Sequence, residues 1–157
     1  MMATLPDRSR RDALRLAAGA LALVVCRPAA AEAEALKDAI DAYARGRAVT
    51  LSRVTIEVAR LVDNGNAVPV TVRVASPMTA ADHVVAIALF SERNPERDVA
   101  RFTLTPRTGR AEVAMRIRLA TSQQLVAIAT TSDGALWSGA VDVVVTLAAC
   151  IEGEGMP

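Results

Sequence analysis

The fold class of this chain is decided by the stretch Val68-Pro69-Val70-Thr71-Val72-Arg73-Val74, in which every second residue is valine. Successive side chains of a β-strand point to opposite faces, so this period of two predicts a strand with one buried face. Residues 54–58 alternate in the same way, and Asp63-Asn64-Gly65-Asn66 between the two runs is typical of a turn. We expect the two runs to pair, with Pro69 at a strand start or a sheet edge because it donates no ladder hydrogen bond.

Further strands are expected along the rest of the chain, each bounded by turn residues. Together with the first two they give seven strands, at residues 54–58, 68–74, 84–90, 100–105, 113–119, 125–130 and 136–147. Short strands at this spacing, with no helices between them, predict an all-β, immunoglobulin-like seven-stranded sandwich. A small barrel is the alternative. A short helix over residues 34–45 precedes the strands, because apolar residues there recur with helical spacing and Gly46 follows.

Composition agrees with a single β domain. The chain has 157 residues, which suffices for one compact domain, and it is 52% hydrophobic but only 3% aromatic. A core of small, β-branched side chains favours sheet over helix. The formal net charge of +1 provides no concentrated basic face of the kind that nucleic acid requires.

The N-terminal residues 1–33 have the features of an export signal. Four arginines precede an apolar run at residues 16–25, and small residues follow at 29–33. The apolar run is too short to span a membrane, which takes about 20 residues. The pair Arg10-Arg11 in its context resembles the bacterial twin-arginine signal, and a general secretory signal is the alternative. Both predict export across the inner membrane to the periplasm, with cleavage after Ala31 or Ala33.

Cleavage would remove Cys26 and leave Cys150 as the single thiol. We therefore divide the chain into a signal (1–33), a domain (34–147) and a C-terminal cysteine arm (148–157). One cysteine cannot form an internal disulfide, so Cys150 is either an exposed reactive group or a structural residue that continues the last strand.

Other candidate chemistry is sparse. The single histidine, His83, follows Asp82, but adjacent strand residues point to opposite faces, so the carboxylate is poorly placed to orient the ring. One histidine and one cysteine supply no zinc site, and no phosphate-binding or dinucleotide motif occurs. Arg116 and Arg118 share a strand face, and Arg101 could lie across from them. Such a patch is either an anion-binding surface or an ordinary solvated face.

Taken together, the turn and strand sequences resemble the SoxY family, the sulfur-carrier subunit of the bacterial thiosulfate-oxidising Sox system. The likeness covers nearly the whole chain after the signal. Its main stretches are Asp63-Asn64-Gly65-Asn66-Ala67-Val68-Pro69-Val70, Ser76-Pro77-Met78-Thr79, Asn94-Pro95, Val99-Ala100-Arg101-Phe102, Thr105-Pro106-Arg107-Thr108-Gly109-Arg110-Ala111, Ile117-Arg118-Leu119-Ala120, Ser132-Asp133-Gly134 with Trp137, and Val145-Thr146-Leu147 before the cysteine.

The resemblance implies a periplasmic carrier that pairs with a second β-sandwich subunit, SoxZ. In that family a cysteine on a terminal arm is loaded with thiosulfate by a c-type cytochrome and is then presented to a hydrolase and a sulfur dehydrogenase. The matching residue here is Cys150. The resemblance implies no catalysis by the carrier, no cofactor and no metal.

The arm departs from the family pattern GGCGG. Here Ala148 and Ala149 precede Cys150, and Ile151, Glu152 and Gly153 follow it. Fewer glycines leave fewer backbone conformations, and the acidic residues disfavour a thiolate, so we expect a stiffer and more acidic arm. The alternative function is a SoxY-like binding subunit that carries no sulfur, in another periplasmic oxidation system such as one with a quinoprotein dehydrogenase.

Overall fold

The computed structural model describes residues 29–146, which form one helix followed by short strands in two sheets. In chain order the elements are α2 (Ala29–Ala44), β1 (Val49–Leu51), β2 (Val54–Glu57), β3 (Leu61–Val62), β4 (Val68–Val74), β5 (Val84–Ser91), β6 (Asp98–Thr103), the 3-10 helix η1 (Pro106–Thr108), β7 (Glu112–Ile117), β8 (Gln123–Thr131) and β9 (Leu136–Val145). Between residues 29 and 146 the structure contains no helix whose length and hydrophobicity would allow it to span a bilayer.

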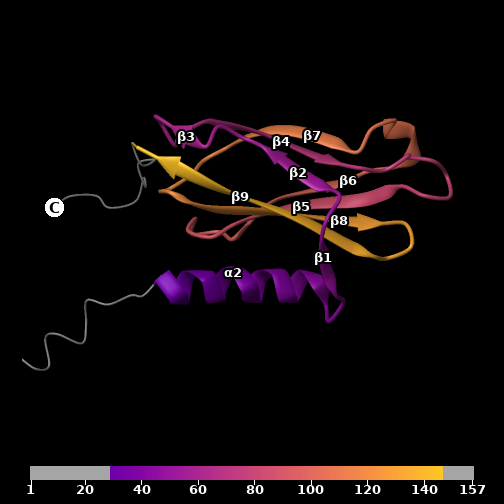
Figure 1. The fold of residues 1–157 in the computed structure, drawn as a ribbon, viewed down its shortest axis with the longest axis horizontal. Helices are drawn as coiled ribbons and strands as arrows, with labels where there is room; N and C mark the ends of the chain where they lie inside the picture. Colours follow the sequence, from indigo (N-terminus) through magenta and orange to yellow (C-terminus); the bar gives the residue numbers. More distant parts are fainter. Residues whose placement is uncertain (1–28, 147–157) are drawn as a thin grey trace, which may run out of the picture. The chain divides into compact units, whose positions relative to one another are not determined.

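The strands form a sandwich of two sheets. The larger sheet has the order β1-β9-β8-β5-β6, and β3 also pairs with β9, whereas the smaller sheet has the order β2-β4-β7. Figure 1 shows the sheets facing each other, with α2 on the outer face of the larger one. The predicted all-β sandwich with a short N-terminal helix is thus confirmed. All seven predicted strands are present, and the structure adds two short ones, β1 and β3.

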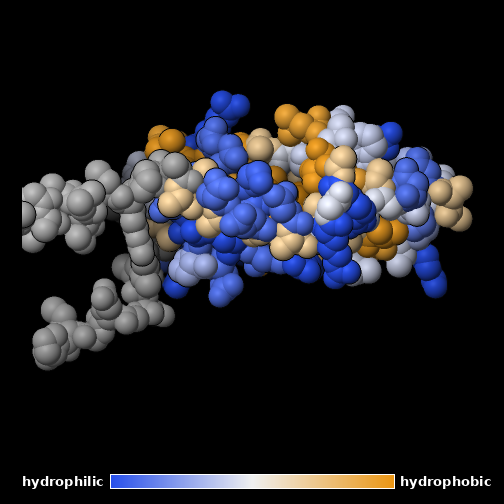
Figure 2. Space-filling model, turned by 90° about the horizontal axis from the view of Figure 1, so that it is seen from below, coloured by the Kyte–Doolittle hydropathy of each residue, from blue (hydrophilic) through white to orange (hydrophobic). Residues whose placement is uncertain are grey.

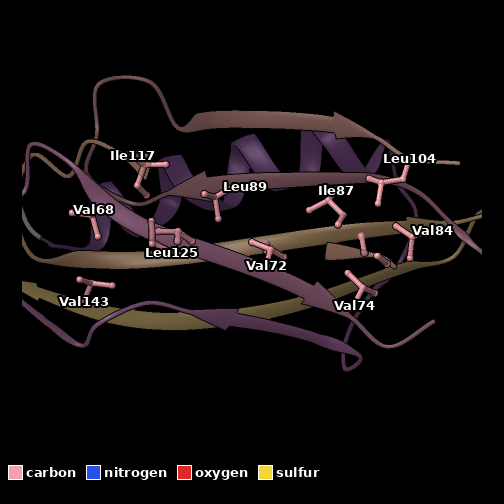
Figure 3. Packing of buried hydrophobic residues seen from close by; sticks show 14 of the residues in the cluster. Val68, Val72, Val74, Val84, Ile87, Leu89, Leu104, Ile117, Leu125 and Val143 are labelled. Atoms are coloured by element: carbon pink, nitrogen blue, oxygen red, sulfur yellow. The ribbon is translucent and has the colours of Figure 1, made fainter. Parts of the chain in front are cut away.

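The strand that decided the fold class lies at the centre of the smaller sheet. The four valines of β4 are buried and its intervening residues are largely exposed, as the alternation predicted. They face Ile87, Leu89, Leu125 and Val143 of the larger sheet (Figure 3). Burying each aliphatic side chain contributes about 2 kcal/mol, so this layer supplies much of the hydrophobic stabilisation.

The predicted pairing of the first two strands is also confirmed, since β2 pairs antiparallel with β4 from Val54 opposite Val74 to Glu57 opposite Thr71. Pro69 lies at the second position of β4, opposite Arg116 of β7 and beyond the residues that pair with β2. On its β2 side this position is a sheet edge, where the missing proline donor costs no ladder hydrogen bond.

Helix α2 covers the second face of β5 and β8, which explains why these strands are buried on both sides. Leu36 and Ala44 pack with Phe90, Val126 and Ile128, and the rings of Tyr43 and Phe90 meet edge to face at 5.6 Å. The helix begins at Ala29 rather than at the predicted Glu34, because the alanine-rich residues before Glu34 are strong helix formers.

The outer edge of β9 is covered by two short parallel strands. β1 pairs with residues 136–138 and β3 pairs with residues 144–145. Between them the chain crosses to the smaller sheet as β2, through Arg53 in a left-handed conformation with φ of 61°. The crossing requires Gly139, because a Cβ there would lie 2.3 Å from the carbonyl oxygen of Val54. Because β1 and β3 pair with its first and last residues, both ends of β9 are paired on this edge.

Candidate functional site

The cysteine arm itself lies outside the described residues. This applies to Cys150 and to its predicted neighbours Ala148, Ala149, Ile151, Glu152 and Gly153. The structure does describe the chain up to Thr146, and so it defines the root from which the arm leaves the domain. Cys150 is the fourth residue after Thr146, a span of at most about 14 Å.

Hydrogen bonds hold the root on two sides. Towards β3, the amide of Val144 donates to the carbonyl of Arg60 at 2.8 Å, and the amide of Thr146 donates to the carbonyl of Val62 at 3.0 Å. On the other side the amide of Val145 donates to Ser122 Oγ at 2.9 Å. The Thr146 hydroxyl adds a bond to the carbonyl of Asp63 at 3.2 Å. The backbone position is thus fixed within four residues of the thiol.

Apolar side chains are exposed along the same edge of the larger sheet. Leu61 and Val144 are partners in the β3–β9 register and are 61% and 52% exposed, and Leu51 of β1 is 75% exposed. Within residues 31–146 these are the exposed large hydrophobic side chains. Figure 2 views the molecule from the helix side, and patches of hydrophobic residues (orange) are exposed there between the hydrophilic ones (blue). We call Leu51, Leu61 and Val144 the apolar edge.

His83 lies far from the arm root. Its carbonyl accepts the amide of Ser132 at 2.8 Å, which places it beside the turn that precedes β9. Thr146 follows the opposite end of β9, a strand of 10 residues and hence roughly 33 Å long. Cys150 reaches only about 14 Å beyond Thr146. The arrangement therefore provides no histidine that could act as a base for the thiol.

The arginines that were predicted to share a surface are separated. Arg101 is in β6 of the larger sheet, whereas Arg116 is in β7 of the smaller sheet, so Arg101 does not lie across from Arg116 and Arg118. The prediction treated neighbours in sequence as neighbours in one sheet, but η1 connects the two sheets. A hydrogen bond to Asp98 holds Arg101 and raises the pKa of its guanidinium.

No group of three or more His, Cys, Asp or Glu side chains within the described part of the chain is arranged to hold a metal ion. The residues that fix the arm root, Ser122 and Thr146, were not singled out by sequence reasoning. A serine in a loop and a threonine at a strand end carry no distinctive pattern, so no sequence signal could have identified them.

Comparisons with known proteins assign the family. The family model described as "Sulfur oxidation protein SoxY" matches residues 40–150, a range that ends at Cys150. The solved structure of the sulfur carrier protein SoxY from Chlorobium limicola f thiosulfatophilum is similar with a TM-score of 0.62 and 31% sequence identity, covering 73% of this chain and 99% of that one. No curated protein sequence matches the chain.

Superoxide reductases share the sandwich but resemble the chain less. A superoxide reductase (neelaredoxin) from Ignicoccus hospitalis has a TM-score of 0.53 at 24% identity, covering 60% of this chain and 80% of that one. The superoxide reductase from Nanoarchaeum equitans has a TM-score of 0.53 at 15% identity, covering 61% and 100%. These likenesses concern the fold alone.

On the family match and the similarity to a sulfur carrier of known structure, this chain belongs to the SoxY family of sulfur oxidation proteins.

Proposed function

We propose that this protein is a periplasmic sulfur carrier that holds sulfur intermediates covalently on Cys150. The observation that carries the proposal is the SoxY family match, which extends to Cys150, the one thiol that the predicted cleavage of the signal leaves in the chain. The fixed root at Thr146 supports it, because a thiol within about 14 Å of a rigid anchor can be presented to several enzymes in turn.

The loading step joins Cys150 Sγ to the outer sulfur of thiosulfate. One S–S bond forms, the thiol proton is released, and two electrons leave the two sulfur atoms. A c-type cytochrome of the Sox system is the proposed acceptor of these electrons, and a hydrolase and a sulfur dehydrogenase then act on the bound group. The thiolate is the reactive form, so the acidic Glu152 must be offset by positive charge from the partner during loading.

The proposed partner subunit is a SoxZ-like β-sandwich that binds the apolar edge. Leu51, Leu61 and Val144 lie on β1, β3 and β9, and exposed apolar residues grouped on one edge of a sheet are typical of a protein contact. The edge adjoins the arm root through Val144, so the partner would sit next to the chain segment that leads to Cys150.

Intact mass of the exported protein tests the carrier function. In cells that oxidise thiosulfate we expect an added thiosulfate group on the wild-type protein and none on Cys150→Ser. The thermal unfolding of both proteins is measured in parallel, so that loss of the adduct can be separated from loss of the fold. An unmodified wild-type protein in cells with a working pathway would refute the proposal.

A second candidate function follows from the arm sequence. Ala148, Ala149 and Ile151 stand where the family pattern has glycine, and Glu152 adds negative charge. These features favour a SoxY-like binding subunit that carries no sulfur, in a periplasmic oxidation system such as one with a quinoprotein dehydrogenase. In that case Cys150→Ser would leave both complex formation and activity intact, whereas the carrier function predicts an intact complex without activity.

A further inference from the structure

A hollow of about 270 Å³ lies between the end of α2 and strand β6, and arginines dominate its lining. The lining residues are Ala39, Ala42, Tyr43, Arg45, Arg47 and Arg101. The three guanidinium groups come from two separate parts of the fold, since Arg45 and Arg47 follow the helix and Arg101 projects from β6. No carboxylate is among the lining residues.

Two of the three guanidinium groups are held in place. Arg47 donates from Nε to the carbonyl of Ala44 at 3.0 Å and from Nη1 to the carbonyl of Gly134 at 3.2 Å. Arg101 donates from Nε to Asp98 Oδ2 at 2.6 Å, and its guanidinium lies 5.2 Å from the centre of the Tyr43 ring. A guanidinium has five N–H donors, so both groups keep donors for a ligand. Their fixed positions lower the entropic cost of binding one.

The charges of the hollow are poorly compensated. Asp98 pairs with Arg101, but the nearby Asp41 on α2 forms its ion pair with Lys37 at 2.8 Å. Within residues 31–146 no hydrogen bond or ion pair of the Arg45 side chain is present. Arg47 complements the negative end of the helix by bonding to the carbonyl of Ala44, yet this role explains neither Arg45 nor Arg101. Like charges that share a hollow repel one another unless an anion lies between them.

The backbone that brings Arg45 to the hollow is unusual for that residue. Arg45 has φ of 51° and is followed by Gly46 with φ of 78°. Glycine adopts this left-handed conformation readily, whereas a long side chain does so at a cost of about 1 kcal/mol or more. Helix termination by Gly46 alone would not need an arginine at the preceding position. This conformation turns the chain at the end of α2, where Arg45 joins Arg47 and Arg101 in the lining of the hollow.

We propose that this hollow binds a small, doubly charged tetrahedral oxyanion of the sulfate or thiosulfate type. Guanidinium forks match such oxygens in geometry and charge. Arg47 contacts Gly134, just before β9, so the hollow lies at the opposite end of β9 from the arm root at Thr146. A group carried on Cys150 cannot span that length, and the ligand of the hollow is therefore free in solution.

Calorimetric titration of the purified protein with sodium sulfate, against sodium chloride at equal ionic strength, tests this site. We expect saturable binding of sulfate and none of chloride. Arg45→Asn keeps a residue that tolerates the left-handed conformation, and Arg101→Gln removes the charge on β6. Each should weaken sulfate binding by about tenfold, whereas Arg116→Gln on the smaller sheet should leave it unchanged.

Two further titrations test the independence and the selectivity of the hollow. Cys150→Ser should bind sulfate like the wild type, so failure of the carrier function leaves this proposal standing, and loss of binding in this variant would overturn it. A synthetic glutamate-rich peptide should bind more weakly than sulfate. Three outcomes would overturn the assignment to a small oxyanion. The peptide could bind more tightly than sulfate, or sulfate and chloride could give equal responses. Alternatively, Arg116→Gln could lose as much sulfate affinity as Arg45→Asn and Arg101→Gln.

Discussion

At Gly139 the backbones of the two sheets approach each other closely. It lies in β9 of the larger sheet, and the carbonyl of Val54 in β2 occupies the space of its missing side chain. The contact accompanies the crossing of the chain from β1 in one sheet to β2 in the other. A glycine inside a strand commonly marks such a close approach of another backbone.

We predict that Gly139→Ala destabilises the domain by about 1 to 3 kcal/mol, because the added Cβ would lie 2.3 Å from the Val54 oxygen and must push the sheets apart. Urea unfolding measures the change. The matched control is Ala140→Ser, the next residue and an exposed one, which should stay within about 0.5 kcal/mol of the wild type. Equal stability of the two variants would contradict the close contact.

Helix α2 belongs to the domain because one face of it is buried against the larger sheet. Leu36 is 6% exposed and packs in the cluster that contains Phe90, Val126 and Ile128. An ion pair of 2.8 Å between Glu32 and Arg93 also links the first turns of the helix to the residues after β5. Half-exposed pairs of this kind contribute less than about 1 kcal/mol, so the apolar face provides most of the attachment.

Replacing Leu36 by alanine should lower the free energy of unfolding by about 2 to 3 kcal/mol, through lost burial and an incompletely filled space. Lys37→Ala is the control, because Lys37 is exposed and loses only its pair with Asp41, with an expected change below about 0.5 kcal/mol. Circular dichroism during urea unfolding reports both variants. If they unfold at the same denaturant concentration, α2 does not contribute to the folded domain as described.

Elements with a clear period could be predicted from the sequence, and elements without one could not. The alternation of residues 68–74 identified β4, and helical spacing identified α2 apart from its first turn. By contrast β1 and β3 have only 3 and 2 residues, too few for any period to appear. They exist because β9 offers unpaired backbone groups along its edge, which is a tertiary effect.

The candidate site was predictable in one part only. Sequence alone singled out Cys150 and its arm, and it placed the end of the last strand at residue 147, two residues beyond the end of β9 at Val145. The residues that fix the root come from distant parts of the chain, namely Ser122 and the segment of Arg60 to Asp63. Hydrogen bonds between such distant residues depend on the completed fold and leave no local pattern.

The apolar edge should determine how the protein assembles with a partner subunit. We predict that the double variant Leu61→Ser and Val144→Ser weakens binding of a SoxZ-like subunit by more than tenfold while the domain stays folded, because both side chains are already exposed. Calorimetric titration with the purified partner measures the affinity. Ala114→Ser, exposed on the smaller sheet, is the control and should bind like the wild type. Wild-type affinity of the double variant would exclude this edge.

The parallel pairing of β9 with β1 and β3 has a mechanical consequence. A partner enzyme that binds the arm could exert a force on the C-terminal end of β9. This force would act along β9, parallel to the neighbouring strands β1 and β3. Hydrogen bonds between parallel strands then share the load in shear, whereas a hairpin pulled at its ends would open one bond at a time. A force on the C-terminal end that is directed along β9 would therefore load the bonds to β1 and β3, together with those to the antiparallel β8, in shear.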